Sequence, residues 1–487
     1  MPRRFKMLLL LLIVGAGVGI RLYHLTDPPL DFHPTRQMHS ALIARQFYLT
    51  WRPGDITEEE TLQRALGGRM ARYEPPLFEA LVARTGVLLR KSLGFQLWFA
   101  RVYDLLFWLL GGWGLYRLAR YLIGDWGAVT ALAYWWLLPF AIQASRSFQP
   151  DPLMTVLLVW TAYAAFRGAD RISPSWKWWS AAVALGAAAG IVKIYAVLFA
   201  LGILTAAAWQ RSRHFWRQRA FWLAVVGVTL PVAVVYALMP HNTSVRDFLK
   251  VYLWLSPKFY GGWLTELGVF GGACLLVALA GIAFGGSRLQ ALAWGWGGAY
   301  LLYGFTVPYH IATHSYYHLP LLPLAALGIG SAVEALRPAL PRLARPWRVA
   351  LALGALAAVV YPLGITAWEA QQCTCRQEAA TFRRLGAVLP RDGAIIALTP
   401  AYGYPLMYYA NVSVSFWPTS RYQQAFSLSP DDILQKLRNF SYFLVTDFCE
   451  FDRQPTLRHY LATHYPILME GEGFALYDLR HPLDTQP

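Results

Sequence analysis

A short segment of the chain, Leu30–Gln37, carries side chains that a group-transfer reaction needs. It reads LDFHPTRQ and follows the first apolar stretch. Asp31 or His33 could take a proton from a hydroxyl group, and Arg36 could stabilise a departing phosphate. The same residues also fit a solvated turn, with a helix that starts after Pro34. Both interpretations stay open at this level.

Two further segments place carboxylates beside apolar stretches. In YEPPL, Glu74 precedes two prolines, which suit the first turn of a helix. Glu74 could favour the start of that helix, or it could bind a metal ion or belong to a phosphate site. In SRSFQPDPL, Arg146 and Asp151 could form a satisfied ion pair or act in the reaction.

Histidines and one lysine form the remaining candidates. His310, His314 and His318 lie four residues apart in YHIATHSYYHLPLLP. On one helical face they could bind a metal ion, but two prolines interrupt the helical pattern. The alternative is an aromatic belt at a membrane interface. Lys193 stands between two apolar runs, where it could reach the membrane surface or neutralise a lipid phosphate.

The elements that position these side chains are membrane helices. The 487 residues are 56% hydrophobic and only 14% charged, against roughly 25% charged residues in soluble chains. This composition excludes a soluble enzyme and a disordered chain, and the 4 cysteines exclude a disulfide scaffold. We predict a polytopic α-helical membrane protein with about eleven transmembrane helices. The apolar stretches are Phe5–Leu25, Leu97–Leu122, Trp126–Ala144, Leu153–Phe166, Trp178–Val192, Ile194–Trp209, Phe221–Met239, Leu264–Phe284, Leu289–Val307, Tyr316–Val333 and Val349–Trp368.

The net charge of +16 indicates orientation rather than a nucleic acid partner. With the N-terminus inside, the cytoplasmic ends of the predicted helices carry 17 basic residues and three acidic ones. Positive side chains collect on the cytoplasmic side of membrane proteins. We therefore predict an integral protein of the cell (inner) membrane with a cytoplasmic N-terminus, surrounded by membrane lipids.

Two parts of the chain would then lie outside the cytoplasm. The first loop, about 26–96, contains a capping-box pattern at Thr57 and Glu60 and a helix suited to the membrane surface. Residues 369–487 alternate strand-like stretches with helix-like ones, which predicts a small extracytoplasmic α/β domain after a transmembrane domain of residues 1–368. The strand-like stretches are GAIIALT, FSYFLVTD and PILMEGEGFALYDL. Three of the four cysteines lie in this domain, where one disulfide or unpaired thiols are both compatible with the sequence. They are Cys373, Cys375 and Cys449.

Titratable side chains concentrate on the predicted outer side. Seven of the eight histidines before residue 369 lie there in this topology, together with Asp31, Glu74 and Asp151. Chemistry is therefore expected at that face, beside the lipid. The sequence has no Walker-type loop, no dinucleotide glycine fingerprint and no Asp-x-Asp pair, so no nucleotide cofactor is expected.

In this order, the segments resemble the GT-C superfamily of integral-membrane glycosyltransferases. The branch they resemble is that of the protein O-mannosyltransferases and lipid A aminoarabinose transferases. The resemblance covers nearly the whole chain and implies a GT-C-like transmembrane catalytic domain followed by an α/β domain. It rests on the segments FHPTRQMHSALIARQFY, YEPPL, SRSFQPDPL, HSYYHLPLLP and FALYDL.

The resemblance implies an inverting transferase that moves a hexosyl or pentosyl group from a polyprenyl-phosphate carrier to an acceptor hydroxyl at the outer face. The acceptor would belong to a lipid, a polysaccharide or a protein. Asp31 would be the general base, and Arg36 and Lys193 would hold the carrier phosphate. Asp151 would act with Arg146, a further candidate for phosphate binding, to organise the base or the acceptor.

The chain departs from the family pattern at two positions in the first loop. Phe32 follows Asp31 where the family has a second acidic residue, so His33 could stand at the catalytic position instead. His39 stands where related chains often have Asp.

The resemblance also suggests a divalent metal ion, held by Glu74 with His241 or His314. Two other classes of protein compete with a transferase. One is a transporter or flippase of a lipid-linked or small polar solute, and the other is a receptor whose outer domain binds a ligand. Transporters place charged residues near the bilayer midplane within inverted repeats, whereas this sequence shows no repeat and collects its ionisable groups at one interface.

Overall fold

The chain folds into two compact units. The computed structural model describes residues 3–170, 172–239, 249–425 and 434–483. One unit, here called the helical unit, comprises Met1–Leu25, Ala71–Phe78 and Trp98–Gln372. The other, the α/β unit, comprises Thr26–Met70, Glu79–Leu97 and Cys373–Pro487. Most of the predicted first loop therefore groups with the C-terminal part of the chain.

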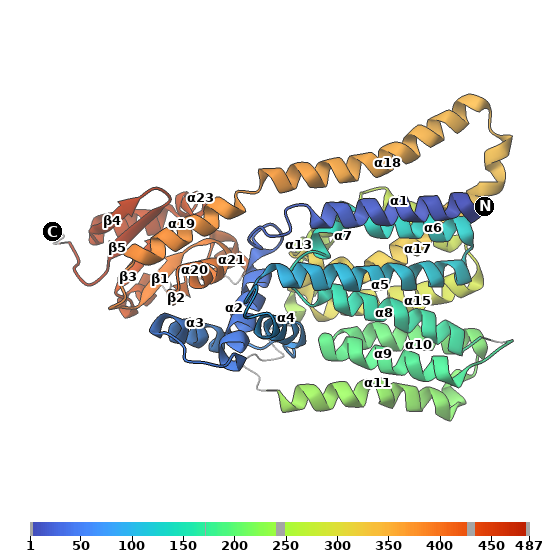
Figure 1. Ribbon diagram of the computed structural model, residues 1–487, viewed down its shortest axis with the longest axis horizontal. Helices are drawn as coiled ribbons and strands as arrows, with labels where there is room; N and C mark the ends of the chain where they lie inside the picture. The colour runs from blue at the N-terminus through green and yellow to red at the C-terminus, as the bar shows by residue number, and fades with distance from the viewer. Residues whose placement is uncertain (1–2, 171, 240–248, 426–433, 484–487) are drawn as a thin grey trace. The chain divides into compact units, whose positions relative to one another are not determined.

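Helices make up the helical unit, and many of the long ones run side by side (Figure 1). They are α1 (Arg3–Leu22), α5 (Trp98–Leu122), α6 (Asp125–Leu137), α7 (Pro139–Ala144), α8 (Asp151–Gly168), α9 (Trp176–Val192), α10 (Ala196–Arg211), α11 (Arg219–Leu238), α13 (Pro257–Glu266), α14 (Cys274–Ala283), α15 (Ser287–Thr306), α16 (Pro308–Ile311), α17 (Leu322–Leu336) and α18 (Arg345–Gln372). Short 3-10 turns are η1 (Phe215–Arg217), η2 (Val251–Leu255), η3 (Leu267–Phe270), η4 (Ser315–Leu321) and η5 (Arg337–Arg342).

Each of the eleven predicted apolar stretches coincides with helical structure, but several are broken or carry charges. Among the described residues, four helices are long and apolar enough to span a bilayer alone, or five if a pair bent by 87° is one span. The bent pair is α13 and η3 with α14, and α6 and α7 likewise share one stretch. The protein is thus an integral membrane protein with several apolar helices. The apolar spans are Arg4–Leu22, Arg219–Leu238, Ser315–Arg342 and Arg345–Val388.

Glycines allow neighbouring helices of this unit to approach closely. A Cβ atom added to Gly202 of α10 would collide with the carbonyl oxygen of Gly295 on α15, and the reverse substitution would collide in the same way. Gly281 of α14 meets the backbone of Gly328 on α17 in a similar contact. Close backbone packing through small residues is typical of membrane helices, where apolar lipid supplies no hydrophobic driving force between them.

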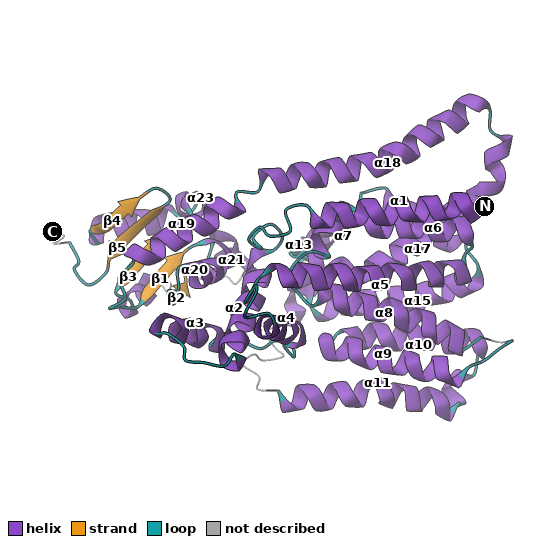
Figure 2. Cartoon of the chain, in the orientation of Figure 1, coloured by secondary structure: helices purple, strands orange, loops and turns teal. Residues whose placement is uncertain are grey.

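The α/β unit combines helices with one mixed sheet (Figure 2). The strand order is β2-β1-β3-β5-β4; β1 is parallel to β2 and β3, whereas β5 is antiparallel to β3 and β4. The elements are α2 (Pro34–Trp51), α3 (Glu58–Gly68), α4 (Leu77–Leu88), α19 (Cys375–Val388), β1 (Ile395–Leu398), η6 (Pro400–Gly403), α20 (Tyr404–Tyr409), β2 (Val414–Phe416), α21 (Ser420–Ala425), η7 (Gln435–Asn439), β3 (Tyr442–Val445), α23 (Phe448–Asp452), α24 (Pro455–His464), β4 (Ile467–Gly471) and β5 (Phe474–Asp478).

The sheet has a continuous apolar core, because β1 and β3 are buried along their whole length. Phe443 and Leu398 pack in this core with Trp417, which follows the short strand β2. The predicted capping box is present, since the side chain of Thr57 accepts a hydrogen bond from the Glu60 backbone and Glu60 bonds back. The start of α3 and the strands β1 and β3 therefore follow from residues close together in the sequence.

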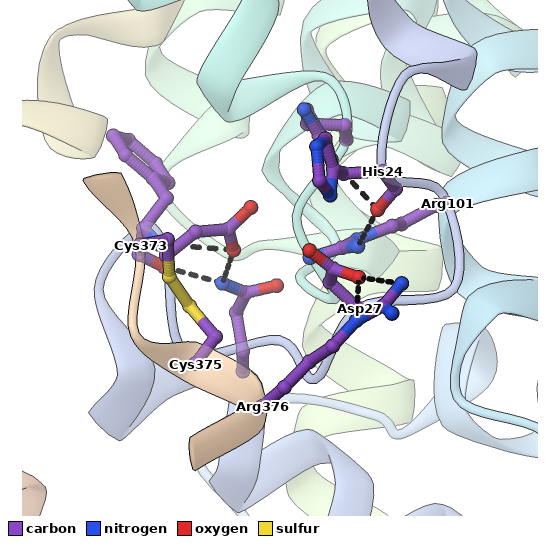
Figure 3. Close-up of a disulfide and its surroundings, with 10 residues drawn as sticks. His24, Asp27, Arg101, Cys373, Cys375 and Arg376 are labelled. Carbon is purple, nitrogen blue, oxygen red and sulfur yellow. Dashed lines mark hydrogen bonds and ion pairs between the residues drawn. A yellow bond between two sulfur atoms is a disulfide. The ribbon is translucent and has the colours of Figure 1, made fainter. Parts of the chain in front are cut away.

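The start of α19 is tied down by a disulfide and an ion pair (Figure 3). Cys373 and Cys375 form a disulfide, and Arg376 donates to the carboxylate of Asp27 with 2.6 Å between Nε and Oδ1. Cys449 of the same unit is a free thiol. The sequence was compatible with one disulfide or with unpaired thiols, and the structure contains the disulfide between Cys373 and Cys375.

At the end of β5, a charge cluster makes the α/β unit sensitive to pH. Hydrogen bonds from the Arg480 side chain hold the pKa of Asp478 well below its ordinary value, against the effect of burial. Because the folded pKa is depressed, this stabilisation is present above the unfolded pKa of about 3.9 and is lost as the pH falls through the folded pKa.

We expect Asp478→Asn to lower the free energy of unfolding by about 1–2 kcal/mol at pH 7, because charge-assisted hydrogen bonds are lost. Thermal unfolding of the detergent-solubilised chain across a pH series measures this change. The difference between variant and wild type should shrink below about pH 4, where the unfolded carboxyl protonates. An equal difference at pH 3 and pH 7 would contradict the electrostatic cause.

Candidate active site

In the α/β unit, the predicted base lies just before the first turn of α2. Asp31 is exposed, and its Oδ1 accepts hydrogen bonds from the Phe32 backbone N–H at 3.1 Å and from Gln37 Nε2 at 3.2 Å. Gln37 is fully buried and also donates to the Phe32 carbonyl at 2.6 Å. The side chain of Gln37 thus holds one carboxylate oxygen of Asp31 in place. The predicted helix start is realised too, because α2 begins at Pro34.

His33, the alternative base, occupies a special backbone position. It is the N-cap of α2 with φ 46° and ψ 63°, a left-handed conformation that non-glycine residues seldom adopt. Its ring meets the edge of the Phe32 ring, with 4.6 Å between the centroids. Its carbonyl accepts the first backbone hydrogen bonds of the helix, from Arg36 and Gln37. These contacts give His33 a structural part in turning the chain into α2.

Arg36 and His39 face each other one turn into α2. Arg36 Nη1 lies 3.4 Å from His39 Nδ1, and the imidazole is buried. A guanidinium can only donate, so His39 accepts at Nδ1 and is neutral in this contact. His39 therefore orients Arg36 without neutralising its positive charge, which an aspartate at the same position would do.

In the helical unit, Lys193 and Asp151 form a buried ion pair. Lys193 Nζ lies 2.9 Å from Oδ1 and 2.8 Å from Oδ2 of Asp151, and the exposed side-chain fractions are 4% and 0%. Tyr195 OH donates to Oδ1 at 3.2 Å. Asp151 begins α8, while Lys193 ends α9 and precedes α10. Asp151 is therefore paired with Lys193.

Tyrosine rings surround the ammonium group of Lys193. Its Nζ lies 5.5 Å from the centroid of Tyr195, 5.7 Å from Tyr316 and 5.8 Å from Tyr317. Electron-rich ring faces attract a cation, and the attraction grows when water is excluded. The lysine is thus held inside the protein instead of extending to the membrane surface.

Two arginines of the helical unit converge on one carbonyl oxygen. Arg101 Nη1 donates to the His24 carbonyl at 3.0 Å (Figure 3) and to Leu25 at 3.0 Å, and Arg146 Nη2 donates to His24 at 3.2 Å. Both arginines are buried. Nearby, Arg21 of α1 donates to Ser145 Oγ at 2.7 Å, which anchors the residue before Arg146. Arg101 and Arg146 therefore both hold the chain at His24.

Sequence reasoning missed a buried carboxyl in the same unit. Asp104 on α5 is fully buried, and neither of its oxygens has a hydrogen-bond partner among the described residues. The amide of Gln149, also fully buried, likewise lacks one within the described part of the chain. Asp104 lies close enough to Asp151 for their charges to repel. The residues around Asp104 predict only a membrane helix, so the sequence did not indicate that this carboxyl would be buried without a hydrogen-bond partner.

We expect Asp104→Asn to stabilise the fold by about 1 kcal/mol at pH 7. On folding, the buried carboxyl must either lose the hydration of its charge beside Asp151 or take up a proton, and asparagine avoids both costs while keeping the side-chain shape. The unfolding temperature in detergent measures the effect. Asp125→Asn on α6 serves as the control, because Asp125 is paired with Lys6 and Arg120 and its loss should not stabilise the chain. A clear fall in the unfolding temperature of Asp104→Asn would show that the carboxylate itself is needed.

The predicted metal ligands do not form a cluster within the described residues, where no group of three or more His, Cys, Asp or Glu side chains could hold an ion. His241 lies outside the described residues. His314 Nδ1 is 2.7 Å from the hydroxyl of Thr313.

The other two histidines of the motif have different surroundings. His318 Nε2 donates to the Ile311 carbonyl at 2.9 Å, so its Nδ1 accepts from Tyr300 OH at 2.6 Å. Both nitrogens of His318 are thus used inside the protein. Burial, followed by the charges of Lys250 and Lys193, lowers the pKa of His310 to about 4. His310 is consequently neutral at physiological pH.

Comparison with known proteins finds similarity to membrane mannosyltransferases and a shared fold with solved glycosyltransferases. Residues 74–237 match the family model described as dolichyl-phosphate-mannose-protein mannosyltransferase, a range that contains Glu74, Arg146, Asp151 and Lys193. ArnT from Cupriavidus metallidurans, solved with undecaprenyl phosphate, is 13% identical, with a TM-score of 0.56 and 98% of each chain covered. The chain is therefore similar to this family over residues 74–237 and shares the ArnT fold over nearly its whole length.

Other GT-C structures share this fold over a longer chain. The Archaeoglobus fulgidus oligosaccharyltransferase in its apo form is 11% identical with a TM-score of 0.55, covering 91% of this chain and 70% of that one. AglB from the same organism, in complex with an inhibitory peptide and a dolichol-phosphate, is 13% identical with a TM-score of 0.53, covering 97% and 74%. No curated protein gives a significant sequence match. The predicted resemblance to GT-C enzymes that use polyprenyl-phosphate sugars is confirmed.

Proposed function

We propose that this GT-C protein transfers a sugar from a polyprenyl-phosphate carrier to an acceptor hydroxyl at the outer face of the cell membrane. The observation that carries the proposal is the family match, because it spans the buried Lys193–Asp151 pair. The lipid phosphates bound by ArnT and by AglB support the class of donor. The acceptor would be a lipid, a polysaccharide or a protein.

In the proposed reaction, Asp31 accepts the proton of the acceptor hydroxyl as its oxygen attacks the anomeric carbon. The bond from that carbon to the carrier phosphate breaks, and the phosphate leaves with the bonding electrons. A direct displacement of this kind inverts the anomeric configuration. Gln37 keeps Asp31 oriented through the 3.2 Å hydrogen bond to Oδ1. A base held in this way loses little orientational freedom when the acceptor binds.

Cationic side chains stabilise the phosphate that departs. We assign Arg36, Arg146 and Lys193 to this work, because each is cationic and two of them are buried, where charge interactions are stronger. Asp151 holds Lys193 between the tyrosine rings. His39 contacts Arg36 with 3.4 Å between Nδ1 and Nη1 and helps to position its guanidinium. A divalent ion held by Glu74 with His241 or His314 stays a prediction, although an Archaeoglobus fulgidus oligosaccharyltransferase has been solved with Zn.

The membrane topology is part of the same proposal. About eleven crossings would place the N-terminus in the cytoplasm and residues 369–487 outside it, because positive side chains mark the cytoplasmic ends of the helices. The sugar transfer would then take place on the side opposite to the cytoplasmic nucleotide pool. A lipid-linked donor supplies an activated sugar at that face without a nucleotide.

The proposal is tested by presenting the purified protein with a panel of labelled polyprenyl-phosphate sugars and candidate acceptors. We expect at least one donor to yield a glycosylated acceptor and free carrier phosphate. Proteoliposomes that contain the same preparation report solute flux in parallel. Flux of an unmodified solute, with no turnover of any lipid-linked sugar, would instead favour the transporter or flippase.

A further inference from the structure

A cavity of about 440 Å³ lies within the α/β unit. Its walls come from α2, α3, α19 and the end of α20. Ligand pockets in proteins are typically about 300–1,000 Å³, so this one is large enough for a monosaccharide with an attached group. None of Asp31, Arg36 and Gln37 is among its lining residues.

Arg45 supplies a buried and incompletely paired cation to this cavity. Its side chain is 7% exposed, and Nη1 donates to the Tyr408 carbonyl at 2.7 Å and to Asn411 Oδ1 at 3.2 Å. Nε and Nη2 have no hydrogen-bond partner among the described residues. Buried polar groups are almost always hydrogen-bonded, and a buried charge without a counter-charge is costly. An anion in the cavity would satisfy both requirements.

The surroundings of Arg45 add positive charge. Arg383 of α19 and Arg391 also line the cavity, against one lining carboxylate, Glu59. Glu59 Oε1 already accepts a hydrogen bond from Asn411 Nδ2 at 2.6 Å. The guanidinium of Arg383 lies 5.1 Å from the ring centroid of Tyr409, which holds it near the cavity. Burial lowers the pKa of Arg45, as expected for a cation with too little negative charge around it.

The remaining lining groups suit a polyhydroxylated ligand. Gln63, Asn411 and the carboxylate of Glu59 offer donors and acceptors at the level of sugar hydroxyls. Tyr408 and Tyr409 add aromatic rings beside them, against which the C–H face of a sugar ring can pack. A simple inorganic anion would leave these groups and most of the volume unused.

We propose that this cavity binds a saccharide that carries an anionic group, a phosphate or a carboxylate. Arg45, Arg383 and Arg391 recognise the anion, while the amide and tyrosine side chains contact the sugar ring. The inference rests on the cavity alone and stands independently of the proposed transfer reaction.

Calorimetric titration of the full-length protein in detergent tests the proposal. The probes are glucose 1-phosphate and glucuronate, with glucose and inorganic phosphate as controls. We expect saturable binding of at least one anionic sugar, at least tenfold tighter than either control, and the preferred probe distinguishes phosphate from carboxylate. Binding of neither anionic sugar, or equal binding of inorganic phosphate or of glucose, would overturn the proposal.

Substitutions place the binding in this cavity. Arg383→Ala and Arg391→Ala change exposed side chains and should each weaken binding about fivefold to tenfold, as the loss of one charge-assisted contact does. Arg384→Ala is the matched control, because Arg384 is an exposed arginine of the same helix that does not line the cavity. Arg45→Met should reduce affinity more than tenfold, with an unfolding curve confirming the fold. Equal effects of Arg383→Ala and Arg384→Ala would rule the cavity out.

Discussion

Asp31→Asn should lower kcat by about 10²–10⁴-fold while the protein stays folded, because positioned general bases contribute about that much. Asparagine keeps the side-chain shape and an oxygen that can accept from Gln37 and from the Phe32 backbone. It cannot take a proton from the acceptor hydroxyl. Turnover of a lipid-linked donor, measured for wild type and variant at saturating substrate, gives the size of the effect.

His33→Ala is the matched comparison, because His33 lies two residues after the proposed base. The structure gives His33 the N-cap position of α2, so its removal should cost some stability and leave kcat within a few-fold of wild type. The two variants together decide between the two bases that the sequence left open. An active Asp31→Asn beside an inactive, folded His33→Ala would transfer the role to the histidine.

Lys193→Met should destabilise the chain by about 3–5 kcal/mol, the largest stability effect that we expect, because it leaves the fully buried carboxylate of Asp151 without its cation. Methionine keeps most of the apolar length of the lysine side chain among the tyrosine rings. Unfolding in detergent, followed by tryptophan fluorescence or by proteolysis, measures the loss. An unfolding curve identical to that of wild type would contradict the buried ion pair.

The double variant Lys193→Met with Asp151→Asn separates stability from phosphate binding. It removes both charges and keeps an acceptor for Tyr195, so most of the lost stability should return. The KM for the lipid-linked donor should stay raised, because the cation assigned to the phosphate is still missing. Full recovery of donor affinity in the double variant would reduce Lys193 to a structural partner of Asp151.

Short-range patterns predicted much of the fold. The capping box of α3, the strands β1, β3, β4 and β5, and the helix start at Pro34 follow from neighbouring residues, and all are present. The strand β2 was missed because it has only three residues, although the alternating VSVSF around it is a strand signal. The apolar stretches were found, but composition alone did not reveal the 87° bend between α13 and α14.

Long-range pairing explains what the sequence could not predict about the candidate site. Asp151 and Lys193 are 42 residues apart, and the nearer Arg146 was the more obvious partner. Arg45 and the Tyr408 carbonyl are separated by 363 residues, so no local pattern indicates the cavity they share. Asp104 lies on a membrane helix whose pattern of apolar residues indicates burial, but that pattern does not show whether the carboxyl has a hydrogen-bond partner. Such contacts depend on how helices pack, which the residue types along one helix do not determine.

We propose above all that this protein breaks the bond between a sugar and a polyprenyl phosphate. The most direct test is the ratio of free carrier phosphate released to sugar transferred, measured with a doubly labelled donor and the purified protein. The proposed mechanism predicts a ratio of about one for wild type and loss of both products in Asp31→Asn, since a single displacement forms them together. Sugar that crosses a vesicle membrane while still attached to its carrier, with no phosphate released from any donor, would contradict it.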